Sequence, residues 1–203
     1  MKKLILTSVF LLALPISAQD RTQAVGRVVS VQGRAEIVWP DGQRNQALRS
    51  IEVLEKDTLE TGPNGVIQVR FSDGAILSLG CNSSLRIDQY KAGGGEFVEM
   101  QLLRGRIRTI TGTTDPEKYR LNVNTPNANV RITTPKTDFE VVEESQDRMS
   151  SGVYTGGIEI HTNLGSLELG VGEDFAFSRL ERGEPPIGVA TRPSSLQPNT
   201  GCI

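Results

Sequence analysis

The chain has 203 residues, with 22 Lys and Arg against 24 Asp and Glu, one His and two Cys. A net charge of −2 gives no general attraction for nucleic acid or for an anionic membrane, so no nucleic-acid partner is expected. One histidine and two cysteines are too few for the ligand sets that zinc prefers. The length suits one domain, with or without a tail.

The N-terminus has the three parts of a secretory signal peptide. Lys2 and Lys3 precede an apolar run from Leu4 to Leu14, and the small residues of Ile16-Ser17-Ala18 follow. The run is too short to span a membrane, which needs about 20 residues. We therefore expect a signal peptide over 1–18 and a periplasmic mature protein without a membrane span. The alternative is an uncleaved amphipathic or buried helix.

From Val25 onward, apolar and polar residues alternate in short runs separated by glycine. Val66–Phe71 and Ile76–Leu79 flank an Asp-Gly turn, which is a strong hairpin signal. Arg49–Leu59 is the best helix candidate, but it fits a strand about as well. The 21 glycines and 10 prolines would interrupt long helices. The pattern predicts an all-β domain over 25–178, built as a sandwich, a barrel or an irregular β-solenoid. Other expected strands are 97–103, 107–111, 119–123, 130–132, 139–142, 157–161, 166–169 and 174–178.

Residues 179–203 contain four prolines and little apolar periodicity, which predicts an irregular tail. Cys81 and Cys202 could form a disulfide in an oxidising compartment and so attach this tail to the domain. The alternative is two unpaired thiols, because the sequence does not show that the two sulfurs meet.

Several short motifs occur in the order found in the periplasmic domain of FecR-like regulators, and over about 25–177 the chain resembles that family. The first is a "D-x-hydrophobic-x-T-G" turn ahead of two strands joined by a "D-G" turn. The matching segments are Asp57–Gly62, Ser72–Gly74, Leu102–Ile107, Val123–Ala128, Asp138–Val141, Gly156–Ile160 and Leu169–Glu173.

The resemblance implies an all-β domain that binds another envelope protein. One departure follows Val130-Arg131, where Ile132–Thr137 replaces the family's "V-R-G-T" run, so contacts made by that loop are not carried over. A second is the expected signal peptide, which stands where full-length regulators have a cytoplasmic anti-sigma segment and a transmembrane helix. The chain therefore resembles a stand-alone, exported form of the domain.

Residues suited to catalysis are sparse, and no enzyme activity, cofactor or metal site is predicted. His161 lies on an alternating strand, and the chain has no G-x-S-x-G nucleophile elbow. Glu143 and Glu144 would point to opposite faces of a strand, so we expect two solvated charges. The glycine-rich segment 92–96 lacks the Lys-Ser/Thr of a phosphate loop and is interpreted as a hairpin connection.

Arg104, Arg106 and Arg108 alternate, so a continuous strand would place all three guanidinium groups on one face. Such a row could bind phosphates or carboxylates of a partner bidentately. The alternative is a solvated face whose charge is balanced across the sheet. The acidic residues considered for that balance are Asp88, Glu96 and Glu99.

Two functions remain in competition. The first is a non-catalytic protein-interaction module that uses an exposed sheet edge or loops to bind another envelope protein. The second is a glycan or surface-lipid binding module, in which Trp39, beside Pro40-Asp41-Gly42, would be an aromatic platform. A tryptophan at a turn can instead be a hydrophobic cap.

Overall fold

The computed structural model describes residues 24–91, 97–112 and 120–196, and every regular element in these ranges is a β-strand. The prediction of an all-β fold is therefore confirmed. Across the same ranges no helix is long and apolar enough to cross a membrane.

The strands are short, and most are joined by tight turns. In chain order they are β1 (Ala24–Gln32), β2 (Ala35–Val38), β3 (Arg44–Gln46), β4 (Glu52–Leu54), β5 (Thr58–Thr61), β6 (Val66–Phe71), β7 (Ile76–Leu79), β8 (Ser84–Lys91), β9 (Phe97–Ile110), β10 (Arg120–Asn124), β11 (Asn129–Ile132), β12 (Asp138–Ser145), β13 (Arg148–Thr155), β14 (Gly157–Thr162), β15 (Gly165–Gly170), β16 (Phe177–Glu181) and β17 (Ile187–Val189).

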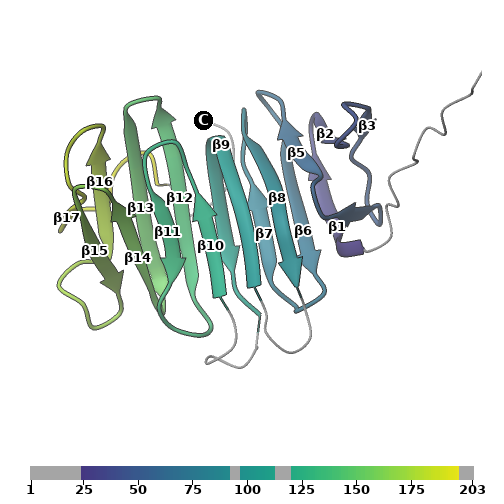
Figure 1. Cartoon of the computed structure of the whole chain (residues 1–203). Coiled ribbons are helices and arrows are strands. Elements are labelled where there is room, and N and C mark those ends of the chain that lie inside the picture. The colour runs from purple at the N-terminus through teal and green to yellow at the C-terminus, as the bar shows by residue number, and fades with distance from the viewer. Residues whose placement is uncertain (1–23, 92–96, 113–119, 197–203) are drawn as a thin grey trace, which may run out of the picture.

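These strands form two sheets that share β9. The first sheet has the order β4-β1-β6-β7-β9-β12-β13-β16-β17. The second has the order β3-β2-β5-β8-β9-β10-β11-β14-β15. Neighbours are antiparallel except for β9 and β10. The chain advances along the long axis, from β1–β3 at one end to β14–β17 at the other (Figure 1).

The core lies between the sheets because alternate residues of each strand point inward. On β6, Ile67 and Val69 are fully buried, whereas Arg70 between Val69 and Phe71 is exposed. Ile107 and Val141 contribute from β9 and β12, and Leu59 and Ile160 from the second sheet. Burying a side chain of this size stabilises the fold by roughly 1.5–3 kcal/mol, so the sandwich depends on this alternation.

Strand β9 crosses from the second sheet to the first at Gly105. Before it, Met100 and Leu102 are buried on the core side; after it, Ile107 and Thr109 are, so the core-facing alternation shifts by one residue. Gly105 has φ +82°, a conformation that disfavours a side chain. A Cβ added there would lie 2.1 Å from Ser83 Oγ. That hydroxyl accepts the next N–H of the strand, from Arg106, at 2.9 Å. Glycine at this position therefore allows the crossing.

Two motifs of the FecR resemblance contain side chains that hydrogen-bond to the backbone. In the first, the N–H of Leu54 donates to Asp57 Oδ2 at 3.0 Å, and Asp57 is fully buried. Thr61 Oγ1 accepts from the N–H of Ser83 at 2.9 Å. In the Val123–Ala128 segment, Thr125 Oγ1 accepts the N–H of Ala128 at 2.9 Å. These side chains are used to shape the backbone.

The structure differs from the expected irregular tail after Arg179. Strand β16 continues to Glu181, β17 follows at Ile187–Val189, and Leu196 is buried. The inward pair Ser178 and Leu180 is too short a pattern to indicate a strand, and the prolines lie in the connecting loops. Residues 92–96, expected to be a hairpin connection, lie outside the described residues.

Candidate functional site

The three alternating arginines do not form one row. Arg104 precedes the Gly105 crossing and is exposed, whereas Arg106 and Arg108 follow it on the outer face of the first sheet. The Arg104 side chain has no ion pair or hydrogen bond with any residue that the structure describes. Strand β9 is continuous, but the crossing at Gly105 shifts its alternation, so the expectation that the three arginines share one face is wrong.

Arg106 forms a buried ion pair with Glu140 of β12. The Arg106 side chain is 10% exposed and that of Glu140 is fully buried. Glu140 Oε2 also accepts the hydroxyl of Tyr154, on β13, at 2.8 Å. The second interaction of Arg106 is with the main chain, since Nη2 donates to the carbonyl of Ser195 at 3.0 Å. The Arg106 guanidinium group is therefore paired within the chain.

Arg108 is held in the same way by Asp138. Its Nε and Nη2 donate to the two oxygens of Asp138 at 2.9 and 2.8 Å, and this hydrogen bonding raises the pKa of Arg108. Its guanidinium carbon lies 4.7 Å from the centre of the Tyr154 ring, and that of Arg192 lies 5.1 Å away. Burial, and then the bond to Glu140, raise the pKa of Tyr154 to about 12. Tyr154 therefore stays protonated and acts as a donor.

We call Arg106, Arg108, Asp138, Glu140, Tyr154 and Arg192 the outer-face cluster. The acids expected to balance the arginines have other partners: Asp88 pairs with Arg86, and Glu99 accepts Asn124. Glu96 lies outside the described residues. The cluster's carboxylates were missed, although Asp138 and Glu140 alternate as Arg106 and Arg108 do. The sequence therefore contained a signal for these ion pairs: opposite charges that alternate with the same spacing on two strands.

The C-terminal segment 192–196 lies over this cluster. Arg192 Nη2 donates to the Tyr154 hydroxyl at 2.5 Å, and Ser195 Oγ donates to Glu144 at 2.6 Å. Leu196 is 3% exposed, and a Cβ added at Gly152 would meet its Cδ1 at 3.1 Å. The segment therefore closes the outer face of the first sheet, and the cluster holds it there.

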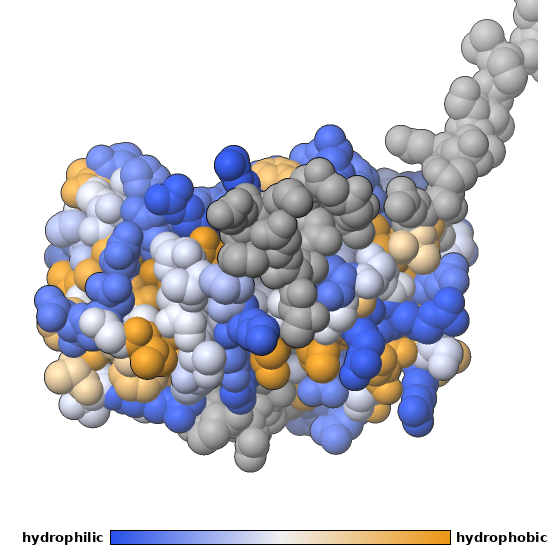
Figure 2. Space-filling model, turned by 90° about the horizontal axis from the view of Figure 1, so that it is seen from below, coloured by the Kyte–Doolittle hydropathy of each residue, from blue (hydrophilic) through white to orange (hydrophobic). Residues whose placement is uncertain are grey.

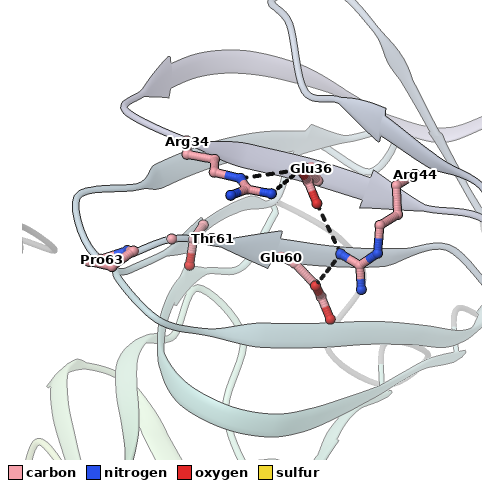
Figure 3. Close-up of a pocket in the computed structure, with 7 residues that line it drawn as sticks. Arg34, Glu36, Arg44, Glu60, Thr61 and Pro63 are labelled. Carbon is pink, nitrogen blue, oxygen red and sulfur yellow. Dashed lines mark hydrogen bonds and ion pairs between the residues drawn. The ribbon is translucent and has the colours of Figure 1, made fainter.

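A second group of charges lines a surface pocket of about 140 Å³ near the other end of the molecule. Arg34 and Arg44 converge on Glu36 of β2, each at 2.9 Å, and Arg44 also reaches Glu60 of β5 at 2.8 Å (Figure 3). Hydrogen bonds from Arg34, and then Arg44, lower the pKa of Glu36. Two arginines and two glutamates balance here, which leaves no net charge to attract a ligand.

The residues considered for catalysis lie on two strands, Glu143 and Glu144 on β12 and His161 on β14. His161 is exposed on β14, and within the described residues no group of three or more His, Cys, Asp or Glu could hold a metal ion. Glu144 is exposed as expected, but Glu143 is only 8% exposed. The prediction of two solvated charges is thus wrong for Glu143, because it points into the sandwich near Met149.

The chain belongs to the FecR protein family. A family model described as FecR protein matches residues 57–159, just over half of the chain. A search of curated proteins found no match. Two crystal structures of a proposed anti-sigma factor from Parabacteroides distasonis ATCC 8503 resemble the chain with 20% identity and a TM-score of 0.49. Each match covers 62% of this chain and 55% of the other, so it spans about half of that protein.

The Arg106–Glu140 pair predicts unequal effects for two neighbouring arginines. Arg106→Gln removes the closer of the two cations that pair with the fully buried Glu140 carboxylate and leaves only Arg192, at 3.8 Å. It should lower the free energy of unfolding by up to about 3–5 kcal/mol. Arg104→Gln changes an exposed residue and should cost within about 0.5 kcal/mol. Urea unfolding followed by circular dichroism measures both. Equal losses in the two variants would show that the pair has no special role.

Glu143 predicts a pH-dependent effect on stability. Burial raises the pKa of Glu143 above its unfolded value, and no described residue forms a hydrogen bond with its Oε1. Its contribution is therefore fully present below the unfolded pKa and is lost as pH rises through the folded pKa. Glu143→Gln should match the wild type near pH 4 and exceed its stability at pH 7.5, by on the order of 1 kcal/mol after solvent screening.

The matched control is Glu173→Gln, which changes an exposed carboxylate outside the strands. Its difference from the wild type should stay small at both pH values in the same urea titrations. A Glu143→Gln variant that loses stability as pH rises, relative to the wild type, would contradict the assignment.

Proposed function

We propose that this protein is an exported, periplasmic, non-catalytic interaction module of the FecR type, which binds another envelope protein in signalling or assembly. Membership of the FecR family supports it. The observation that carries it is that, apart from Glu143, the buried and half-buried charges of the outer-face cluster and of the surface pocket are paired within the chain. Recognition then relies on surface shape and on main-chain groups at the sheet edges.

The open sandwich supplies such edges. Each sheet ends in a strand with a ladder partner on one side only, at β4 and β17 in the first sheet and at β3 and β15 in the second. An extended segment of another protein can add to such an edge through main-chain hydrogen bonds. This mode of binding needs no reactive side chain.

The proposal includes the Cys81–Cys202 disulfide as an anchor of the C-terminal segment. Cys202 lies outside the described residues, but two contacts link Ser195, seven residues before it, to the strand beside Cys81. The N–H of Gly80 donates to the carbonyl of Arg106 at 3.0 Å, and Arg106 holds the carbonyl of Ser195. The residues from Ser195 to Cys202 can extend roughly 20 Å, enough to reach back to Cys81.

Export and the disulfide have a common test by intact mass. Protein purified from the periplasm should begin at Gln19 and lack two hydrogens relative to the reduced form. Iodoacetamide should modify it only after reduction. Modification of both cysteines without reductant would contradict the disulfide, and a retained Met1 would contradict cleavage.

The glycan or surface-lipid alternative has less support. Trp39, its expected aromatic platform, is partly buried and packs against the hydrophobic core. That position fits the hydrophobic cap.

The interaction itself is tested in intact cells. Chemical cross-linking and mass spectrometry with the tagged full chain should recover one envelope protein reproducibly. The control is a chain starting at Gln19, which stays in the cytoplasm and should not recover it. Recovery of nothing above background, or steady turnover of a substrate by the mature protein, would contradict the proposal.

A further inference from the structure

The four edge strands of the sandwich are not equivalent. β3, β4 and β17 have three residues each, and Pro185 and Pro186 precede β17. Short edges and prolines are the usual protection against pairing with another chain. β15 has six residues, with the sequence Gly-Ser-Leu-Glu-Leu-Gly, and carries neither proline nor lysine. It is the longest of the four edge strands among the described residues, and its own sequence contains none of these protecting residues.

The main-chain groups that β15 offers follow from its register with β14. The N–H of Val171 donates to the carbonyl of Gly156 at 3.0 Å, and the ladder continues through Ile158↔Leu169 and Ile160↔Leu167. Bonding alternates along an antiparallel strand, so the groups of Ser166 and Glu168 face away from β14. In the described part of the chain, no residue bonds to these four N–H and C=O groups.

The side chains on the outer face of this edge form an incomplete charge ladder. Across β11, β14 and β15 the register places Arg131, Glu159 and Glu168 side by side. Arg131 pairs with Glu159, whereas Glu168 is exposed and has no ion pair with any described residue. Glu159 and Glu168 are directly opposite, and like charges in that position repel. The next position of the ladder, outside β15, suits a cation.

Apolar side chains are exposed at the same end of the sandwich. Leu164 and Val171, which flank β15, are 50% and 75% exposed, and Ile187 of β17 is 53% exposed. The first residue of β15 approaches the loop before β17, since a Cβ added at Gly165 would lie 3.8 Å from Pro185. Orange patches interrupt the polar surface at the end formed by β14–β17 (left in Figure 2). An added strand would cover apolar surface there.

We infer that β15 is the docking edge for an extended segment of the partner protein, with a Lys or Arg beside Glu168 and apolar residues at the neighbouring positions. The inference rests on the proposed function and names its site. A second copy of the chain is the wrong occupant. Antiparallel pairing of two β15 strands through Ser166 and Glu168 would place both Glu168 carboxylates opposite or diagonal to each other, beside both Glu159 residues.

The first test uses two synthetic peptides of about nine residues, a usual strand length. Val alternates with Thr in both, and the central polar residue is Lys in one and Glu in the other. Nuclear magnetic resonance on the mature protein should show slower amide exchange at Ser166 and Glu168 with the Lys peptide. The Lys peptide should bind about 3- to 10-fold more tightly than the Glu peptide.

Two variants separate main-chain docking from charge attraction. Ser166→Pro removes an N–H that β14 does not use, which an edge strand tolerates, and it should abolish binding of both peptides. Glu168→Lys should reverse the order of the two peptides and relieve the repulsion with Glu159. Glu173→Lys makes the same charge change outside the strand and should alter neither peptide's affinity by more than about 2-fold.

Any of three results would overturn the assignment. They are unchanged peptide binding by Ser166→Pro, equal affinity for the two peptides, and exchange protection at β3 or β4 in place of β15. The whole-protein arm repeats the cellular cross-linking with Ser166→Pro. Loss of the partner supports β15 as the site. A partner retained by Ser166→Pro moves the site elsewhere and leaves the proposed function intact. If the wild-type protein recovers no partner, the proposed function is contradicted. The peptide experiments then test on their own whether β15 is a docking edge.

Discussion

The structure depends on one strand that belongs to both sheets. β9 pairs with β8 and β10 in the second sheet and with β7 and β12 in the first, and it changes sheets at Gly105. The close contact with Ser83 leaves no room for a side chain there, so the register of the surrounding strands is set from this point. Which arginines are buried and which are exposed follows from the same crossing.

The outer-face cluster shows how buried charge can serve conformation. A buried ion pair is weak evidence for net stability, because desolvation offsets its Coulomb energy. Its geometry is nevertheless specific: Arg106 satisfies Glu140 and the carbonyl of Ser195 at once, and Tyr154 and Arg192 complete the arrangement. The main role of the cluster is therefore to position the C-terminal segment, and its contribution to the stability of the sandwich is smaller. Because its charges pair with one another, few remain to bind a ligand.

Alternation predicted much of the fold but could not predict the sites. Val66–Phe71 and Ile76–Leu79 were predicted at their observed bounds, because each has alternating apolar residues and a turn signal between them. β13 was not predicted, because its buried Ser150 and Ser151 resemble loop residues in the sequence. Arg106 and Glu140 are 34 residues apart, so their pairing depends on strand order, which alternation alone does not give.

The negative charge of Glu168 on β15 lowers the stability of this edge but makes strand addition there more specific. Glu168 opposite Glu159 weakens the β14–β15 pair, and a neutral residue would remove that repulsion. The same carboxylate, however, penalises pairing with a second copy and with any acidic strand, while it favours a basic one. An edge that is both long and negatively charged therefore rejects most strands that could add to it. The cost in stability falls on the outermost strand, where the rest of the sandwich is least affected.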